Sequence, residues 1–480
     1  MNNRTLLLLA SLATLTVSAF AQKPADALPT DTTRPNILWI YVEDTNDWMS
    51  CYGDKLIQTP NIDALADSGT RFTRAYMPAG VCSPTRSAII TGMHQTTIGA
   101  HQHYSSFETW RRIKMAEWDP NYLGVRTIPE IMRLARYYAF NKGKLHYNFV
   151  YDIDQLYDSH VGKMNFQGAK GDSCWNGNKS KQPFFGQIQL TGGKTRAKKV
   201  VDRSRVQVPP YYPDHPAIRE SIGKHYDSIL DLDATVGRIV AALKRDGLYD
   251  NTVIIFFSDH GMSLMRHKQF LYEGGIRVPC IIAGPGIPKG KVRDDIVSGI
   301  DLSATTLALA GITIPSHMQG KNIFAKDYHR DHFVAARDRC DYTIDRIRAV
   351  VTKRYKYIRN FMTDRPYLQP QYRDGRRDLE AYRKLYAEGK LNKVQAAFAS
   401  PHRPAEELYD LASDPHETIN LVHNPTHGQA LGEMRTRLDR WIVDTDDQGR
   451  FPESDAALKA VLKRWGNRAV NKEYDRIRGG

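Results

Sequence analysis

The sequence predicts an α/β fold with a mostly parallel central sheet flanked by helices, followed by a smaller C-terminal antiparallel sheet with a helix. Two runs, 36–42 and 251–257, are apolar over most of their length and rich in bulky and β-branched residues. Such runs are typical of strands buried on both faces. A shorter run at 137–140 has the same character, and helical patterns lie between the three. Strands that alternate with helices indicate a mostly parallel sheet.

Turn and cap residues delimit the helices between these strands. The first helix opens at Thr59-Pro60 and closes at Gly69, since proline is favoured at the first helical position and glycine after the last. A second helix begins at a proline and spans about 129–136. A longer helical pattern covers roughly 218–245.

The character of the chain changes near residue 330. The segment 347–358 alternates in places and is broken by Thr-Lys-Arg, and 407–411 is another short strand. A helix is predicted over about 428–441, whereas 364–404 is charged and weakly periodic, which favours an insertion or a long loop. We therefore divide the chain into a leader (1–21), an α/β domain (22–330) and a C-terminal α+β subdomain (331–480).

The N-terminus has the features of a secretory signal peptide. A short positive start that contains Arg4 precedes the apolar stretch 6–15, and Ala19-Phe20-Ala21 is a cleavage motif, so we expect cleavage after Ala21. No later stretch approaches the ~20 apolar residues that a membrane span needs. The sequence therefore predicts a periplasmic or secreted protein with no stable membrane insertion.

The charge balance favours anionic partners. The chain has 67 Lys and Arg against 53 Asp and Glu, a formal net charge of +14, and such a surface attracts polyanions. No Lys/Arg block or basic patch interleaved with aromatic residues points to nucleic acid, so we expect no nucleic-acid partner. A sulfated or carboxylated polysaccharide fits the charge, and simple solubility is the alternative explanation.

The chain has five cysteines, which an exported protein would normally pair, with at least one left over.

Polar clusters directly follow the three predicted strands. The carboxyl ends of parallel strands meet at one edge of a sheet, where ligands bind in α/β folds, so we expect these side chains to lie in one site. The carboxylates among them offer hard anionic oxygens that suit Ca²⁺. Any one of them alone could instead be a solvated charge or a helix cap. The residues are Glu43, Asp44, Lys144, His146, Asp259 and His260.

The Cys-Ser-Pro-Thr-Arg motif at 82–86 is the sharpest feature of the sequence. Ser83 suits a helix cap and Pro84 suits the first helical position, so a helix is predicted to begin there. Cys82 would then lie just before a helix N-terminus, where the helix dipole and Arg86 stabilise an anion. The alternative is a buried structural cysteine.

This motif resembles the signature of the type I, formylglycine-dependent sulfatases of the alkaline phosphatase superfamily, and in particular their sulfamidase-like polysaccharide sulfatase branch. Further motifs between residues 34 and 421 resemble the same family in the same order, which implies an alkaline-phosphatase-like fold. They are Arg34-Pro35-Asn36-Ile37 with Glu43-Asp44, Thr59-Pro60-Asn61-Ile62-Asp63, Gly143-Lys144-Leu145-His146, Ser258-Asp259-His260-Gly261 with Lys268 and Tyr272-Glu273-Gly274-Gly275, and Glu407 to Leu411 with Asp414-Pro415 and Asn420-Leu421.

The resemblance implies a modified residue and a metal. In that family a maturation enzyme oxidises the cysteine to Cα-formylglycine, so the resemblance implies this modification of Cys82 and a maturation enzyme as a partner. One hydroxyl of the hydrated aldehyde then attacks sulfur, the alcohol leaves, and the second hydroxyl expels sulfate. The resemblance also implies one divalent ion, Ca²⁺. Its ligands would be Glu43, Asp44, Asp259 and His260, together with residue 82.

The same resemblance assigns roles to four cationic or imidazole side chains. Arg86 would hold residue 82 and offset its charge. Lys144 and His146 would orient residue 82 and move protons, and Lys268 would grip sulfate oxygens and protonate the leaving oxygen. Fixed cations of this kind act where charge develops during the reaction.

Two metal ligands depart from the family pattern. Many members have Asp where this chain has the longer Glu43, and Asn where it has His260, an imidazole that leaves room for another divalent ion. The family also often has a sulfate-binding His after a Pro-Phe-Phe strand. Lys194 is a candidate for that role here, and His215 is a second.

The segment after the Cys82 helix contains His101 and His103, which resemble histidines of the sulfamidase-like branch and are predicted substrate contacts. The basic segment 194–199 could guide an anionic glycan or be a solvated loop.

The sequence is compatible with three alternative functions. The first is an exported sulfatase that removes O- or N-sulfate from a sulfated carbohydrate. The second is a phosphomonoesterase or phosphodiesterase of the same superfamily, because phosphate and sulfate share tetrahedral geometry. The third is an inactive polyanion-binding protein. A cysteine protease built on Cys82 and His146 is excluded because it does not explain the acidic cluster. The glycan, the sulfate position and the choice between endo and exo attack stay open.

Overall fold

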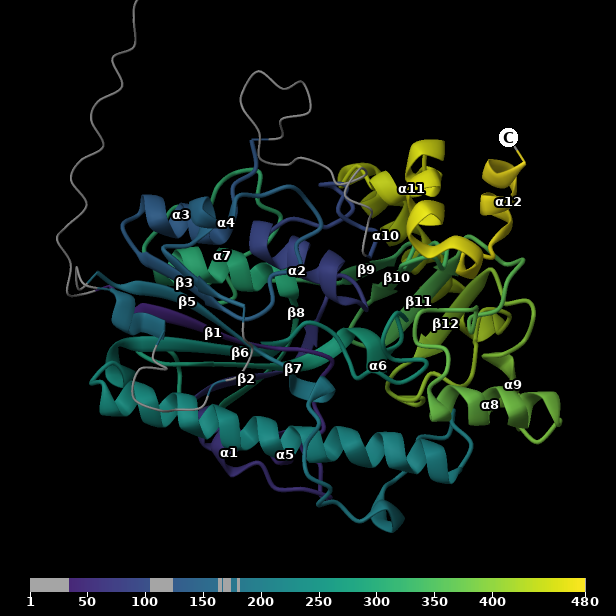
Figure 1. The fold of residues 1–480 in the computed structure, drawn as a ribbon, viewed down its shortest axis with the longest axis horizontal. Coiled ribbons are helices and arrows are strands. Elements are labelled where there is room, and N and C mark those ends of the chain that lie inside the picture. Colours follow the sequence, from purple (N-terminus) through teal and green to yellow (C-terminus); the bar gives the residue numbers. More distant parts are fainter. Residues whose placement is uncertain (1–33, 104–123, 163–165, 167–173, 179–181, 480) are drawn as a thin grey trace, which may run out of the picture. The chain divides into compact units, whose positions relative to one another are not determined.

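The central sheet has eight strands in the order β4-β3-β5-β1-β6-β7-β2-β8 (Figure 1). The structure is a computed structural model that describes residues 34–103, 124–162, 166, 174–178 and 182–479. Strand β7 runs antiparallel to both of its neighbours and the other pairs are parallel, which confirms the predicted mostly parallel sheet. The strands are β1 Asn36–Val42, β2 Gly69–Tyr76, β3 Tyr138–Lys142, β4 Ser159–Val161, β5 Phe184–Leu190, β6 Thr252–Ser258, β7 Arg277–Ala283 and β8 Lys291–Ser298.

Strand β1 shows why the central strands are continuously apolar. All seven of its residues are buried, because helices cover both faces of the sheet. Trp39 packs edge-on against Phe185 of β5 and Phe257 of β6, and its Nε1 donates to Thr306 Oγ1 at 2.9 Å. A strand buried on both sides leaves no face for polar residues. The apolar runs therefore mark β1 and β6 to within one residue.

Helices α2, α3 and α7 lie on one face of this sheet, and α1 and α5 lie on the other (Figure 1). Helix α5 buries apolar side chains at three- and four-residue spacing, among them Ile229, Leu232, Val236 and Ile239. This is the stripe that a helix needs to pack on a sheet. The helices are α1 Pro60–Asp67, α2 Cys82–Thr91, α3 Ile128–Leu134, α4 Ile153–Leu156, α5 Pro216–Arg245, α6 Glu273–Ile276 and α7 Gly299–Leu309.

A second, antiparallel sheet has the order β12-β11-β10-β9. Its strands are β9 Phe333–Arg337, β10 Ile347–Val351, β11 Tyr355–Asn360 and β12 Glu406–Asp410. Helix α10, Gly428–Asp444, packs Leu438 and Trp441 against Val350 and Leu408 of this sheet. The predicted antiparallel sheet with a helix is confirmed, and the polar break in 347–358 is the turn between β10 and β11. Helices α11 Asp455–Trp465 and α12 Lys472–Arg478 follow.

Two local predictions are wrong. Segment 364–404 is not a plain loop, because it contains helices α8 Arg377–Ala387 and α9 Lys393–Ala397. Helix α8 buries only a narrow stripe with Leu379 and Tyr382, so its periodicity is weak in the sequence. Ser83 does not cap α2, because the helix already begins at Cys82 and Val81 occupies the N-cap position.

The predicted signal peptide, residues 1–21, lies outside the described residues. Among the described residues, no helix combines the length and the apolar character that crossing a membrane requires. Cys51, Cys280 and Cys340 form no disulfide, although an exported protein would normally pair its cysteines, and Cys82, which was not expected to pair, is also a free thiol.

Candidate active site

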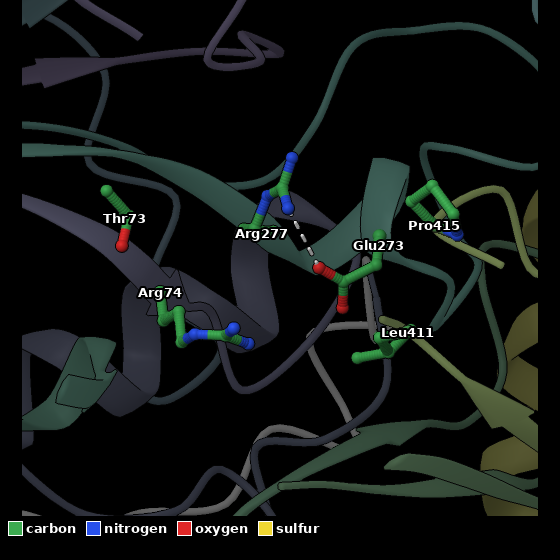
Figure 2. Close-up of a pocket in the computed structure, with 6 residues that line it drawn as sticks. All are labelled: Thr73, Arg74, Glu273, Arg277, Leu411 and Pro415. Carbon is green, nitrogen blue, oxygen red and sulfur yellow. Dashed lines mark ion pairs between the residues drawn. The ribbon is translucent and has the colours of Figure 1, made fainter. Parts of the chain in front are cut away.

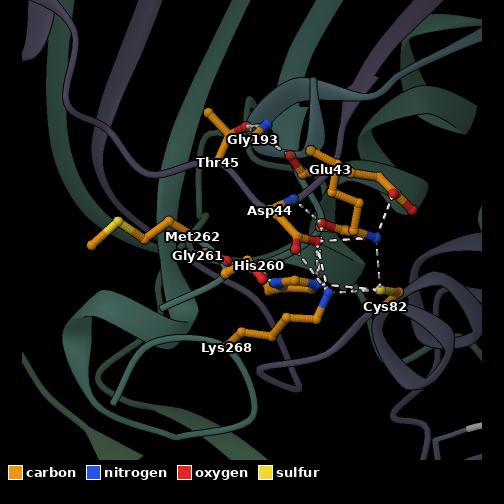
Figure 3. A network of polar contacts seen from close by, with 12 residues as sticks. Glu43, Asp44, Thr45, Cys82, Gly193, His260, Gly261, Met262 and Lys268 are labelled. Carbon is orange, nitrogen blue, oxygen red and sulfur yellow. Dashed lines mark hydrogen bonds and ion pairs between the residues drawn. The ribbon is translucent and has the colours of Figure 1, made fainter. Parts of the chain in front are cut away.

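The predicted site residues gather where strands β1, β3, β5 and β6 end. Val42, the last residue of β1, pairs with Leu190 of β5 on one side and with Ser258 of β6 on the other. The residues that follow these three strands are therefore neighbours. Figure 3 shows Glu43, Asp44, Cys82, His260 and Lys268 converging on one point.

Close backbone approach brings Lys194 into the same group. Lys194 ends a short 3₁₀ turn, Gly192–Lys194, after β5. A Cβ atom on Gly193 would lie 2.1 Å from the backbone oxygen of Asp44, so only glycine allows this turn to pack against the end of β1. Lys194 Nζ lies 2.6 Å from Glu43 Oε2 and 3.3 Å from Asp44 Oδ1.

Cys82 is buried at the first turn of α2, and its sulfur faces cations. Sγ lies 3.3 Å from His260 Nε2, 3.6 Å from Lys268 Nζ and 3.9 Å from Lys194 Nζ. Burial alone would raise the pKa of the Cys82 thiol, but Lys144 and the other two lysines outweigh burial and hold the pKa well below its usual value. The position is therefore electropositive and suited to chemistry on an anion.

The Arg86 guanidinium is fully buried and connects the acidic groups. Nε and Nη2 donate to Asp259 Oδ2 at 3.3 and 3.2 Å, and Nη2 also donates to Glu43 Oε1 at 3.3 Å. Nη1 donates to Gln189 Oε1 at 2.6 Å, and the guanidinium lies 4.3 Å from the centre of the Tyr41 ring. A planar fork of donors is the group that can serve several buried acceptors at once.

The carboxylate of Asp44 is held in its ionised form. Lys268 Nζ donates to both of its oxygens at 2.8 and 2.9 Å, and Asp44 is itself completely buried. Burial acts to raise its pKa, but Lys268 and Lys194 lower it far below the usual range. Asp44 also has a φ of 48°, a left-handed conformation that is uncommon outside glycine and that concentrates at functional sites.

His260 is oriented for a metal or for Cys82. Its Nδ1 lies 2.8 Å from the backbone oxygen of Gly261, which is the geometry of a donated hydrogen bond and leaves the lone pair on Nε2. Nε2 lies 3.3 Å from Asp44 Oδ1 and 3.5 Å from Asp259 Oδ1. One ligand atom from each of Asp44, Cys82, Asp259 and His260 lies within 4.8 Å of the others. This buried oxygen and imidazole set fits a divalent cation.

The predicted histidines take different positions. His146 and His103 form a second group with Cys82, with one ring nitrogen of each and Cys82 Sγ within 4.8 Å of one another. Burial lowers the pKa of His146 to about 4, so its ring is neutral at pH 7. His101 is partly buried and does not belong to this cluster. His215 is not brought in either, because it caps helix α5 and its Nδ1 accepts from Ala217 N at 3.1 Å.

The family model of the sulfatases matches residues 35–312, more than half of the chain. The chain belongs to the sulfatase family. The resemblance to the type I sulfatases of the alkaline phosphatase superfamily is thereby confirmed, and a second family model, the C-terminal region of N-sulphoglucosamine sulphohydrolase, matches residues 260–403.

Two curated relatives span most of this sulfatase. It is 32% identical to an ulvan-active sulfatase of Formosa agariphila over 89% of this chain and 78% of the relative. It is 25% identical to the human N-sulphoglucosamine sulphohydrolase over 86% of this chain and 90% of the relative. Among solved structures, a 2-O GAG sulfatase is similar with a TM-score of 0.64 and 21% identity, over 89% and 96% of the two chains, which supports the fold.

Several residues around the centre of this sulfatase were missed in the sequence. Gln189, which accepts from Arg86, lies inside the buried strand β5 next to Gln187. Two glutamines inside an otherwise apolar strand were the available signal, because buried polar side chains need partners. Asp341 and Tyr372, which lie beside His103, carry no local signal because the contacts bridge more than 200 residues.

A separate cavity of about 190 Å³ lies where β2 and α6 approach the C-terminal half (Figure 2). It is lined in part by Arg74, Glu273 and Arg277, and none of the site residues lines it. Arg277 is paired with Glu273 at 3.3 Å and with Asp47 at 3.2 Å. Its charge is therefore compensated within the protein, and the cavity belongs to the junction between the two sheets.

Proposed function

We propose that this sulfatase hydrolyses sulfate esters or N-sulfates of a sulfated carbohydrate, with a Cα-formylglycine made from Cys82 and one divalent cation. The observation that carries the proposal is the position of Cys82, whose sulfur lies within 4 Å of Lys194, Lys268 and His260. The names of the two curated relatives, one active on ulvan and one on N-sulphoglucosamine, support a sulfated carbohydrate as the substrate class.

Lys194 and Lys268 bind the sulfate group, whereas Arg86, Lys144 and His146 act on residue 82. The ammonium groups of Lys194 and Lys268 lie 3.9 and 3.6 Å from Cys82 Sγ and neutralise sulfate oxygens there. Arg86 fixes the carboxylates behind residue 82 and offsets charge that develops on it. Lys144 pairs with Glu43 and orients residue 82, and the neutral His146 moves a proton at that position.

The cation belongs with the carboxylates. Glu43, Asp44, Asp259 and His260 would hold it together with residue 82, and buried carboxylates favour Ca²⁺. Of these five residues, all but Glu43 have a ligand atom in the cluster of atoms within 4.8 Å of one another. When present, the hydrated formylglycine supplies a nucleophilic oxygen and the cation draws charge from the sulfate group.

The proposal includes a cellular route. The leader 1–21 directs export to the periplasm or beyond, and a formylglycine-generating enzyme modifies Cys82. The catalytic domain covers residues 22–330, and residues 331–480 form the C-terminal subdomain.

The test combines mass spectrometry and sulfate release. The protein is purified after co-expression with a formylglycine-generating enzyme, and the peptide that contains residue 82 is weighed to establish the conversion of thiol to aldehyde. Sulfate release is then measured on a panel of sulfated oligosaccharides. We expect release by the converted protein and none by Cys82→Ala. Cys51→Ala, a free thiol in a different part of the fold, is the matched control and should keep wild-type activity.

A converted protein that releases no sulfate from any member of the panel would contradict the proposal. Release of phosphate from phosphate esters by protein with an unmodified Cys82 would favour the phosphoesterase function instead.

A further inference from the structure

The segment after α2 is tied to the C-terminal half of the chain beside the candidate active site. His103 N donates to Arg339 O at 2.8 Å, and Asp341 N donates to His103 O at 3.2 Å. These two hydrogen bonds form a bridge between His103 and Cys340, residues that are 237 positions apart. The C-terminal half therefore fixes the backbone that carries His103.

The His103 ring is held as firmly as its backbone. Nδ1 lies 3.2 Å from Asp341 Oδ2 and 3.3 Å from Cys340 Sγ, and all three residues are buried. Asp341 has a φ of 53°, a strained conformation for a residue other than glycine. The Nδ1 atom of His103 is therefore already engaged by Asp341 and Cys340. His103 nevertheless contributes a ring nitrogen to the cluster with Cys82 and His146, so its ring borders the reacting position.

Tyr372 adds an aromatic wall to the same side. Its ring stacks on His103 with centroids 6.0 Å apart. The neighbouring Arg373 is buried and donates to the backbone oxygen of Lys268 at 3.2 Å and to Gln371 Oε1 at 2.9 Å. Segment 364–404, which holds Tyr372, is thus anchored to the loop that carries Lys268.

The surroundings of Cys82 are therefore chemically divided. The side of Asp44, Lys194 and Lys268 is strongly charged and suits sulfate and a cation. His103 and Tyr372 offer an imidazole and a phenol group, the first buried and the second partly exposed, which suit the hydroxyls and C–H faces of a sugar.

We propose that His103 and Tyr372 contact the carbohydrate ring that carries the sulfate, and that Asp341 is a positioning residue for His103. This inference rests on the proposed sulfatase function. The C-terminal half of the chain then contributes to the choice of sugar, whereas the lysines of the N-terminal half recognise the sulfate.

The test separates contacts to sugar from contacts to sulfate. The formylglycine-bearing wild-type protein is assayed with its best sulfated oligosaccharide, and two inhibition constants are measured, one for inorganic sulfate and one for the desulfated product. We expect Tyr372→Ala and His103→Ala each to raise KM and the product inhibition constant about tenfold, as loss of one good contact does. The sulfate inhibition constant should change less than about twofold. Tyr386→Ala, on the exposed side of α8, is the matched control and should change neither.

The positioning role of Asp341 has its own readout. Asp341→Asn retains an acceptor for His103 and should stay close to wild type, whereas Asp341→Ala should reproduce the KM of His103→Ala. The double variant should be no worse than either single one, because the two residues act as one unit.

Three outcomes overturn parts of this reasoning. If sulfate and product inhibition constants change together, or if KM is unchanged in well-folded variants, the sugar-contact inference is wrong. Tyr372 is only partly buried, so its variants decide this even if Asp341→Ala does not fold. If the converted wild-type protein hydrolyses no sulfated carbohydrate, the proposed function fails, and the inference fails with it.

Discussion

Replacement of Arg86 by lysine should separate the charge of this residue from its shape. The guanidinium donates from different nitrogen atoms to Asp259, Glu43 and Gln189, over distances of 2.6–3.3 Å. An ammonium group has its donors on one nitrogen and cannot span these acceptors. At least one completely buried acceptor then loses its partner, which costs about 1–3 kcal/mol of the free energy of unfolding.

The effect on turnover should be larger than the effect on stability. Arg86 holds Glu43 and Asp259 behind residue 82, so its loss displaces groups on which transition-state stabilisation depends. Removal of one preorganised donor from such a site typically lowers kcat by about 100-fold or more. The assay is sulfate release by Arg86→Lys at saturating substrate, normalised to the fraction of converted residue 82, with urea unfolding of the same sample.

The matched control is Arg348→Lys. Arg348 lies in β10, is as buried as Arg86, and pairs with Asp447 and Asp338 rather than with the carboxylates beside residue 82. It should lose a similar amount of stability with kcat unchanged. If folded Arg86→Lys keeps kcat within about threefold of wild type, the reasoning about the guanidinium is refuted.

Three further outcomes are expected. Burial lowers the pKa of His94 to about 3, so the folded protein binds fewer protons than the unfolded chain between about pH 6.5 and 3. Protonation of His94 in the unfolded chain should therefore lower the free energy of unfolding by about 2 kcal/mol between pH 6.5 and pH 5. Urea titrations of His94→Gln at the two pH values should show a free energy of unfolding that depends on pH less steeply by this amount. Lys356 is fully buried, and its Nζ lies 2.8 Å from Glu273 Oε1 and 2.9 Å from Glu417 Oε1. Lys356→Met should therefore lower the free energy of unfolding, measured in urea, by about 3–5 kcal/mol. A decrease below about 1 kcal/mol would contradict the pairing. Chelation of divalent cations should lower both sulfate release and the unfolding temperature, and Ca²⁺ should restore both, because a ligand that binds only the folded state stabilises it.

The sequence predicts the part of the site that follows from strand topology. Residues directly after buried parallel strands must meet at one sheet edge, so Glu43, Asp44 and Asp259 could be grouped without coordinates. The same rule explains Lys194, because it follows β5, the other neighbour of β1. Local patterns were therefore sufficient wherever the backbone ladder itself brings residues together.

The rest depends on contacts that leave no local pattern. Asp341 meets His103 only because the second sheet docks beside α2, and Tyr372 reaches the same place from segment 364–404, whose helices have only a narrow apolar stripe. His215 occupies the N-cap of α5, and a polar residue directly before Pro216 is a helix-cap signal that the sequence already contained.

The balance of charge around residue 82 indicates what the cations bind and what decides the reaction. The buried and half-buried cations outnumber the carboxylates by one. They are Arg86, Lys144, Lys194 and Lys268, against Glu43, Asp44 and Asp259. A thiolate at Cys82 would compensate this excess, and on the proposed function its conversion to an uncharged aldehyde removes that compensation. A sulfate group then becomes the favoured partner of Lys194 and Lys268, because unpaired buried charge is costly. Phosphate has the same geometry and at least as much charge, so the cations alone do not discriminate between the two, and the chemistry at residue 82 has to.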